Sequence, residues 1–141
     1  MSVTNVQFTV ATHIMAALAF NPDEHIHSSA LAKSVNTEPS FVRKSLSKLA
    51  KASLIVTTRG KNGASALARP AKQITLLDIY RASAAPPAVA IHRYPIEKRC
   101  PISANIKVCM ATFLAQAQNS FEKTLARTTL ADLVADLKKK R

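Results

Sequence analysis

The block from Ser28 to Arg69 constrains the fold of this chain more than any other stretch. It contains a short helical segment, whose N-cap is expected to be Ser28 or Ser29. A basic amphipathic helix is predicted next, from about Pro39 to about Ala52, and two β-prone runs joined by a turn follow it. Pro39 suits the first position of a helix, where its missing N–H costs nothing. Asn62-Gly63 can adopt the positive φ angles of a tight hairpin turn. A helix pair followed by a β-hairpin is the order of a winged helix-turn-helix.

Positive charge is concentrated in the same part of the chain. Residues 33–72 hold nine Lys or Arg against a single acid, Glu38, and so supply +8 of the net charge of +12. The first 32 residues hold no Lys or Arg, which argues against a secretory or transit peptide, and no apolar run approaches membrane-spanning length. We therefore expect a cytoplasmic protein with no membrane partner, whose basic surface binds nucleic acid.

The helix that begins near Pro39 has one apolar face and one cationic face. On a helical wheel Val42, Leu46 and Leu49 cluster on one side, while serines and cations cover the other. In isolation such a helix is often only a solvated surface helix. Its place after a helical turn and before a basic hairpin favours contact with nucleic acid instead.

In duplex DNA the N-terminal half of this helix would enter the major groove. There Arg43 or Lys44 can donate hydrogen bonds to guanine O6 and N7, whereas Lys33, Lys48 and Lys51 are expected to bind phosphates. Two roles stay open for the cations at the hairpin tip, namely insertion into a narrow minor groove and simple phosphate contact. The predicted DNA-binding residues are Ser28, Ser29, Lys33, Ser40, Arg43, Lys44, Ser47, Lys48, Lys51, Arg59, Lys61 and Asn62.

The C-terminal part of the chain predicts a long helix with a continuous apolar stripe. Apolar residues recur at three- and four-residue steps from Ile102 to Leu125. Part of the stripe is expected to fold back on the first helix, predicted within residues 5–20, and a second copy of the chain would cover the rest. The predicted dimer-interface residues are Ile102, Ile106, Cys109, Met110, Phe113, Ala117 and Phe121.

These elements predict a mainly α fold with a small β-hairpin wing, in which a long dimerisation helix follows a winged helix-turn-helix. Residues 1–83 are expected to form the DNA-binding domain. Residues 84–99 form a linker, which begins with the stiff run Ala84–Ala88. Residues 100–141 form the dimerisation helix and a short closing helix, which Thr128 or Thr129 is expected to cap and which is expected to end at Leu137.

Several segments of the chain resemble one family of bacterial regulators. They are Leu31-Ala32, Pro39–Lys44, Leu49–Ile55 and, most specifically, the pair Leu67-Ala68-Arg69-Pro70 and Ile74–Ala82. Together they resemble the Rrf family of winged-helix transcriptional regulators over roughly residues 5–83. The resemblance implies a two-fold dimer that represses genes from a palindromic operator and is often switched by an iron–sulfur cluster or a thiol.

The chain departs from the family pattern in its wing and its cysteines. Gly63 is followed by Ala64-Ser65-Ala66, where the family's wing is usually richer in glycine. Cluster-bearing members carry three closely spaced cysteines, whereas this chain has only Cys100 and Cys109. A cysteine-ligated cluster normally needs four ligands. We therefore expect no cofactor, and the run from Cys100 is most similar to the cluster-lacking, YwnA-like branch.

Cys100 is a candidate redox-sensing residue on grounds independent of the family. If Pro101 starts the long helix, Cys100 lies at the positive end of that helix, directly after Lys98 and Arg99, and these features favour a thiolate. The alternative is a small buried residue at a subunit contact. For Cys109, packing in a core or an interface is expected.

No metal-binding or catalytic set is apparent in the sequence. His25 and His27 lie two apart in a loop, which is more typical of a solvated turn than of a metal site. With eight acids and two glycines, the chain shows no paired carboxylates, phosphate-binding glycine loop or nucleophile–base arrangement. The sequence thus predicts a dimeric DNA-binding transcriptional regulator rather than an enzyme, and a response to thiol oxidation or to a small ligand is left open. The alternative is a non-specific nucleoid-type DNA-binding protein. The sequence specifies neither the operator nor a contact with RNA polymerase.

Overall fold

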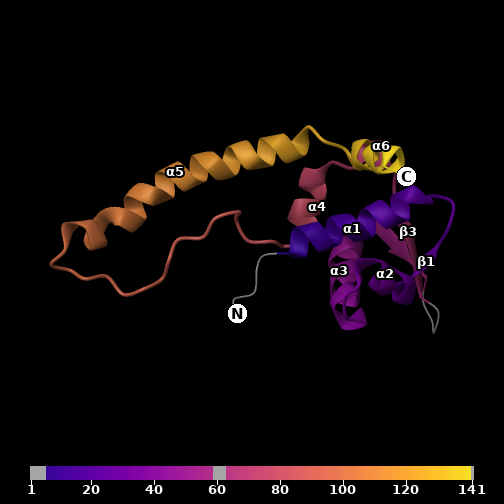
Figure 1. The fold of residues 1–141 in the computed structure, drawn as a ribbon, viewed down its shortest axis with the longest axis horizontal. Helices are drawn as coiled ribbons and strands as arrows, with labels where there is room; N and C mark the ends of the chain where they lie inside the picture. Colours follow the sequence, from indigo (N-terminus) through magenta and orange to yellow (C-terminus); the bar gives the residue numbers. More distant parts are fainter. Residues whose placement is uncertain (1–5, 59–62, 141) are drawn as a thin grey trace.

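The computed structural model describes residues 6–58 and 63–140, and it consists of a body and a long arm (Figure 1). The body contains α1 to α4, the sheet and α6, whereas the arm consists of residues 84–100 and α5. In chain order the elements are α1 (Gln7–Phe20), β1 (Ile26–His27), α2 (Ser28–Val35), α3 (Pro39–Lys51), β2 (Ile55–Thr57), β3 (Ala64–Leu67), η1 (Ala71–Gln73), α4 (Leu76–Ala82), α5 (Pro101–Ala126) and α6 (Leu130–Lys139). The prediction of a mainly α fold with a winged helix-turn-helix and a long C-terminal helix is confirmed.

The hairpin strands β2 and β3 belong to a small antiparallel sheet with the order β1-β3-β2, in which β3 is the central strand. Ile55 lies opposite Leu67, and Thr57 lies opposite Ser65. Directly after β2, Thr58 forms two hydrogen bonds with Ala64. The N–H of Thr58 donates to the carbonyl oxygen of Ala64, and the N–H of Ala64 donates to Oγ1 of Thr58, each at 2.9 Å. The predicted turn at Asn62-Gly63 stays a prediction, because Asn62 is among residues 59–62, which lie outside the described residues. Gly63 directly precedes β3.

The strand β1 is an element that the sequence pattern did not predict. It consists of only two residues, of which Ile26 pairs with Ser65 and His27 with Ala64. Because the chain stays extended through His27, this residue is the N-cap of α2, and Ser28 is the first helical residue. The expectation that Ser28 or Ser29 caps this helix is therefore wrong, since a strand too short to show a period precedes it directly.

The core of the body forms around α1. Ile14, Met15 and Leu18 are fully buried there, and Val42 and Leu49 of α3 are buried against them. Side chains of this size each contribute roughly 1.5–3 kcal/mol when they leave water. The apolar face predicted for α3 is thus the face that fixes this helix to the body.

The closing helix α6 also packs into the body. Leu130 is fully buried, and its N–H donates to the carbonyl of Ile74 at 2.8 Å, while the N–H of Leu76 donates to the carbonyl of Thr128 at 2.8 Å. Thr129 caps α6 in a reciprocal capping box with Asp132, as expected for one of the two threonines. Packing therefore groups residues 130–139 with the body, although the sequence-based boundaries placed them with the dimerisation helix. Those boundaries stay a prediction.

Candidate nucleic-acid interface

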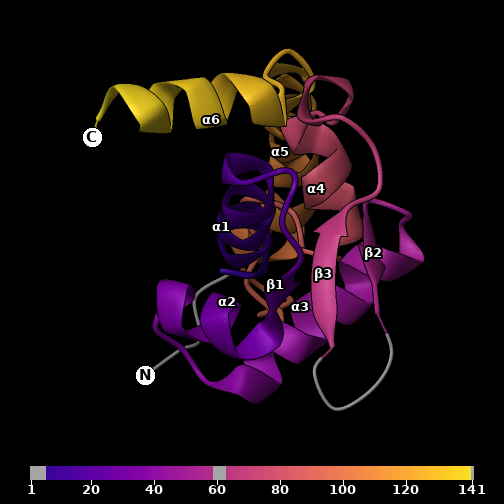
Figure 2. The ribbon, with the colours of Figure 1, turned by 90° about the vertical axis from the view of Figure 1, so that its right-hand side faces the viewer.

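The cationic face predicted for α3 lies exposed at one end of the body. Val42 and Leu49 are fully buried, whereas Arg43, Lys44 and Lys51 are exposed. Figure 2 shows α2, α3 and the hairpin strands β2 and β3 together, and the two strands run toward the end of the body where α2 and α3 lie. The order of elements thus brings the basic helix and the wing to one end.

A shallow cleft of about 560 Å³ runs between α3 and the hairpin. Arg43, Ser47 and Lys51 line it from α3, and Thr57 and Ser65 line it from the strands. Among the described residues that line this cleft there is no Asp or Glu. A concave basic surface with hydroxyl donors is suited to the phosphate backbone at the edge of a groove.

Lys48 is placed differently from the other cations of α3. Its side chain is half-buried, and its Nζ donates to the carbonyl of Ser83, just after α4, at 3.4 Å. The predicted phosphate contact would compete with this hydrogen bond. Lys48 therefore joins α3 to the end of α4, and the helical wheel could not show this because Ser83 is 35 residues away in the chain.

The other predicted DNA-binding residues lie on both helices and on the wing. Ser40 and Ser47 are exposed on α3, and Ser29 and Lys33 are exposed on α2, while Ser28 is half-buried. Arg59, Lys61 and Asn62 lie outside the described residues. The DNA contacts of all these residues stay a prediction.

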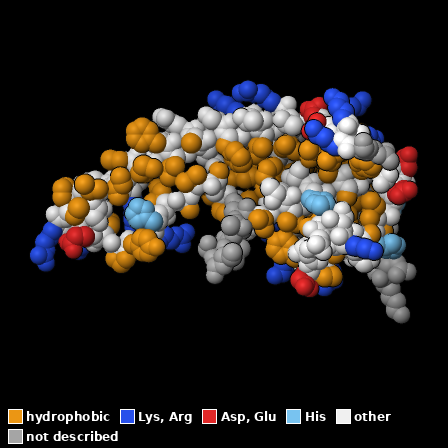
Figure 3. Space-filling view, in the orientation of Figure 1, with side chains coloured by type: hydrophobic (Ala, Val, Ile, Leu, Met, Phe, Trp, Pro, Cys, Tyr) orange, Lys and Arg blue, Asp and Glu red, His pale blue; other side chains and the backbone are white. Residues whose placement is uncertain are grey.

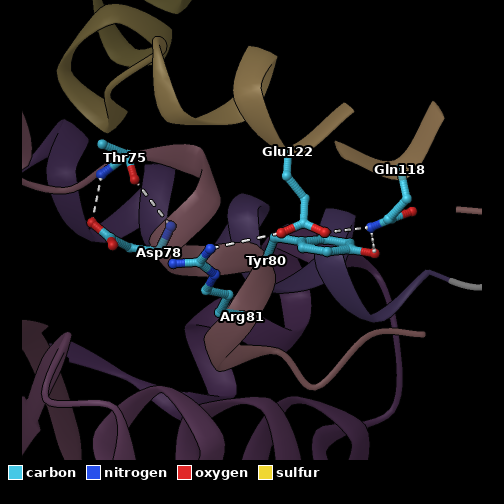
Figure 4. A network of polar contacts seen from close by, with 6 residues as sticks. All are labelled: Thr75, Asp78, Tyr80, Arg81, Gln118 and Glu122. Atoms are coloured by element: carbon cyan, nitrogen blue, oxygen red, sulfur yellow. Dashed lines mark hydrogen bonds and ion pairs between the residues drawn. The ribbon is translucent and has the colours of Figure 1, made fainter. Parts of the chain in front are cut away.

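Tyr80 on α4 connects the body to the arm, and sequence reasoning missed it. Its ring is buried, and its hydroxyl donates to the carbonyl of Pro86 at 2.8 Å and accepts from Nε2 of Gln118 on α5 at 3.0 Å. The same Nε2 donates to Glu122 at 3.0 Å, and Glu122 pairs with Arg81 at 3.7 Å (Figure 4). These partners come from α4, α5 and the segment between them, so no local sequence period could reveal the network.

Aromatic rings extend this connection through α4. The ring of Tyr80 makes edge-to-face contacts with Phe8 of α1 and Phe121 of α5, each at a centroid distance of 5.3 Å. Phe121 was predicted to contact a second copy of the chain. In the subunit its ring lies half-buried against Tyr80, because the proximal end of α5 lies on α4, and its contact with a second copy stays a prediction.

The distal two-thirds of the predicted apolar stripe on α5 lie open. Ile102 is 70% exposed and Phe113 is 64% exposed, and Cys109, Met110 and Ala117 are also exposed, while Ile106 is half-buried. Cys100 is the N-cap of α5, and its Sγ accepts the N–H of Ser103 at 3.4 Å. Cys109 is thus exposed in this subunit, and its expected packing depends on a second chain.

Comparison with known proteins assigns this arrangement of α3, wing and arm to a family. Residues 4–136 match the model of the Rrf2 family, described as iron-dependent transcriptional regulators. The chain belongs to the Rrf2 family. The resemblance noted in the sequence is therefore confirmed, and this Rrf2 protein is a DNA-binding transcriptional regulator.

Two relatives and three solved structures show the extent of the similarity. YwnA of Bacillus subtilis, assigned as an HTH-type transcriptional regulator, is 34% identical over 134 residues, which cover 94% of this chain and 98% of YwnA. The protein aau3 of Rhizobium meliloti is 30% identical over 128 residues, covering 91% of this chain and 82% of aau3.

One solved structure is a protein of Lactobacillus plantarum assigned as a transcriptional regulator. Its TM-score is 0.78 at 29% identity, and the match covers 96% of this chain and 91% of the Lactobacillus chain. CymR, the global cysteine regulator of B. subtilis, has a TM-score of 0.66 at 22% identity, covering 96% of this chain and 98% of its own. IscR of T. potens has a TM-score of 0.71 at 19% identity, covering 100% of this chain and 91% of its own. At these lower identities CymR and IscR show the shared fold alone.

The family description names iron, but the thiols of this Rrf2 protein do not fit a cysteine-ligated cluster within one chain. The full sequence has two cysteines, against the four ligands that a cluster normally needs. Cys109 follows Cys100 by nine residues along α5, which separates them by roughly 13 Å at 1.5 Å per residue. In the ranges 6–58 and 63–140, no group of three or more His, Cys, Asp or Glu side chains could hold a metal ion. Within the same ranges, no helix is both long enough and apolar enough to cross a membrane.

Proposed function

We propose that this Rrf2 protein acts as a homodimer that represses transcription from a two-fold symmetric operator. The observation that carries the dimer is the apolar stripe on the distal part of α5, where Ile102 and Phe113 remain more than half exposed. Exposed apolar patches of this kind mark interaction surfaces on soluble proteins. A second copy of the same helix offers a self-complementary cover for such a stripe.

A face of α5 next to the stripe is already used within the subunit. Residues 86–93 run along α5 beside Lys107, Leu114 and Gln118, and the N–H of Ala88 donates to Oε1 of Gln118 at 2.9 Å. Those α5 positions are rotated around the helix from Ile102 and Phe113. Segment 86–93 thus lies along one face of α5, and the adjacent face is left for a partner.

Two such subunits would present two α3 helices to one duplex. Their half-sites would lie about one helical turn, or a small multiple of it, apart on one face of the DNA. Repression requires only that the bound dimer cover promoter DNA, so a DNA-binding surface and a dimer surface suffice for it. The exposed cations of α3, Arg43 and Lys44 above all, supply the contacts to that DNA.

We propose further that the thiol of Cys100 makes the regulator responsive to oxidants. Its Sγ accepts a backbone N–H at the start of α5, which is one of the N–H groups that a helix leaves unpaired. Oxidation replaces this acceptor with a bulkier group and so changes the first turn of α5. That turn belongs to the arm, and the effect therefore falls on the proposed dimer surface.

The dimer is tested by placing a charge on the apolar stripe of α5 and, as a matched control, a charge on another face of the same helix. Phe113→Glu should convert dimer to monomer in analytical ultracentrifugation. Val108→Glu should not, because Val108 is equally accessible at 75% exposed but lies roughly 140° around the helix from Phe113.

Operators with one or two half-sites then connect the dimer to DNA binding. Phe113→Glu should lose far more affinity for the full operator than for a half-site, because linking two modules multiplies their affinities through effective concentration. A wild-type chain that sediments as a monomer, or a Phe113→Glu variant that stays dimeric, contradicts the proposal.

Selection of bound fragments from genomic DNA supplies the operator and separates a regulator from a nucleoid-type protein. A regulator should enrich one palindromic sequence over bulk DNA, typically by a factor of about 10³ or more at physiological salt. Equal binding to all fragments favours the structural DNA-binding protein instead.

A further inference from the structure

An apolar groove separates the extended segment 86–93 from α5. Its volume is about 710 Å³, which lies in the range of small-molecule sites. Pro86 and Pro87 form part of one wall, and Ala111, Leu114 and Ala115 form the other. Figure 3 shows hydrophobic side chains along much of the arm that contains both walls.

The groove is hollow because small and rigid residues line it. Ala111 and Ala115 lie one helical turn apart on the same side of α5, where larger side chains would fill the space. Pro86 and Pro87 fix the φ angles of the opposite wall and favour an extended course for it. The groove is therefore a feature of the sequence of this arm.

One end of the groove is positively charged. Arg93, Lys107 and His92 line that end, and no Asp or Glu is among the lining residues. Lys107 donates to the carbonyl of Tyr94 at 2.7 Å, and an ammonium group has two further donors. Across the described ranges, neither Lys107 nor Arg93 forms an ion pair with a carboxylate. An apolar channel that ends in two uncompensated cations is complementary to an anion with an apolar tail.

The other end of the groove is hydrogen-bonded to the body. Gln118 lines the groove, accepts the N–H of Ala88 and donates to the hydroxyl of Tyr80, which in turn donates to the carbonyl of Pro86. Tyr80 belongs to α4, and the carbonyl of Ser83 that follows α4 accepts Nζ of Lys48 from α3. Hydrogen bonds and helix α4 therefore join the wall of the groove to α3.

We propose that this groove binds a small amphipathic organic carboxylate and that its occupancy changes the affinity of α3 for DNA. The tail lies over Ala111 and Leu114 between the prolines and α5, and the carboxylate contacts Lys107 and Arg93. The second half of the proposal rests on the proposed function, because it needs an operator whose binding can change. A ligand changes the DNA affinity only if it binds the DNA-bound and the DNA-free protein with different affinities. DNA then changes the affinity for the ligand by the same factor.

A small anion fits the groove better than the arm of a second copy does. Residues 84–126 carry five Lys or Arg, namely Arg93, Lys98, Arg99, Lys107 and Lys123, against the two acids Glu97 and Glu122. Placing one cationic arm in the cationic groove of another brings like charges together. A second copy is better matched to the apolar stripe on the adjacent face of α5.

Binding is tested with three probes that share one tail, namely octanoate, octanol and octylamine, by titration calorimetry on the full chain. Octanoate should bind more tightly than octanol, and octylamine should bind least. Lys107→Met keeps an aliphatic side chain but removes the charge, and it should weaken octanoate by about tenfold, as expected for the loss of one charged hydrogen bond. Ala111→Leu should abolish octanoate binding by filling the groove. Lys123→Met removes a cation from α5 outside the groove and should leave octanoate binding unchanged.

Regulation is tested by measuring operator affinity with and without octanoate. A change that Ala111→Leu abolishes supports the proposal, provided that this variant sediments and binds operator without ligand as wild type does. Octanoate that binds without changing operator affinity overturns the regulatory half. Failure of the ligand-free protein to prefer any operator refutes the proposed function but leaves the binding result standing.

The binding half has its own contrary outcomes. Octylamine that binds as tightly as octanoate, or the absence of binding by all three probes, overturns it. Octanoate that binds the monomeric Phe113→Glu variant but not a dimeric wild type shows that a second copy fills the groove, and it also overturns the proposal.

Discussion

Replacing Leu130 by Ala tests whether α6 is part of the body's core. Leu130 is fully buried at the start of α6 and lies in the same cluster as α1 and α3. Removing a buried leucine side chain to the β-carbon costs about 2–5 kcal/mol, depending on how far the site collapses. For a protein of this size that corresponds to a fall in Tm of roughly 10–15 °C near the middle of the range. Differential scanning calorimetry at fixed protein concentration measures it.

Leu137→Ala is the matched control for this prediction. Leu137 belongs to the same helix but is 41% exposed, so its truncation should cost well under about 1 kcal/mol. Val134→Ala, a smaller truncation at a buried position of α6, keeps the test readable if Leu130→Ala does not fold. Equal and small shifts for Leu130→Ala and Leu137→Ala would refute the assignment of α6 to the core.

Three further predictions concern DNA, pH and the thiols. Arg43→Ala should lower the binding free energy for the selected operator by about 1–3 kcal/mol and relax the specificity of binding. Lys51→Ala should weaken binding to all sequences alike and lower the slope of log affinity against log salt concentration by about 1. Equal loss of affinity for operator and random DNA in Arg43→Ala argues against base readout by Arg43. Hydrogen bonds from the backbone N–H and then the side chain of Thr129 lower the pKa of Asp132, so its contribution to stability is present above the usual aspartate pKa and is lost as the pH falls through the lowered value. The difference in urea stability between wild type and Asp132→Ala should therefore shrink on acidification, and a difference that stays constant with pH speaks against this. A mild alkylating agent should label Cys100 faster than Cys109 at neutral pH if helix-cap placement activates it, and oxidant should change operator binding by wild type but not by Cys100→Ser.

Local pattern was sufficient to predict the helix-turn-helix and its basic face. Pro39 marked the start of α3, and the spacing of Val42, Leu46 and Leu49 marked its buried side, because a helix of thirteen residues shows its period clearly. The long helix α5 was visible for the same reasons, with Pro101 at its start. The sequence offered two threonines as the cap of α6, and the structure shows that Thr129 takes this role in a capping box with Asp132.

Contacts between distant segments were beyond the reach of local pattern. Tyr80 meets Gln118 across 38 residues, and Lys48 meets Ser83 across 35, so neither pair leaves a periodic trace. The apolar stripe on α5 was correct as a pattern, yet nothing in the pattern distinguishes Phe121, which packs on Tyr80 of its own subunit, from Phe113, which stays exposed. Which part of an apolar stripe is used internally depends on where the helix begins to leave the body, and that is a property of the tertiary fold.

The arm is attached to the body at both ends, through the chain that leaves α4 and through α6, which returns to the core. It is in effect an insertion within a domain rather than a tail appended to one. Each residue added in the middle of α5 would lengthen the arm by about 1.5 Å and turn its far end by about 100°, while the core contacts of Leu130 and Ile79 stay as they are. In a dimer built through the arm, insertions in α5 can thus change the distance and the angle between the two DNA-binding bodies without rebuilding either body.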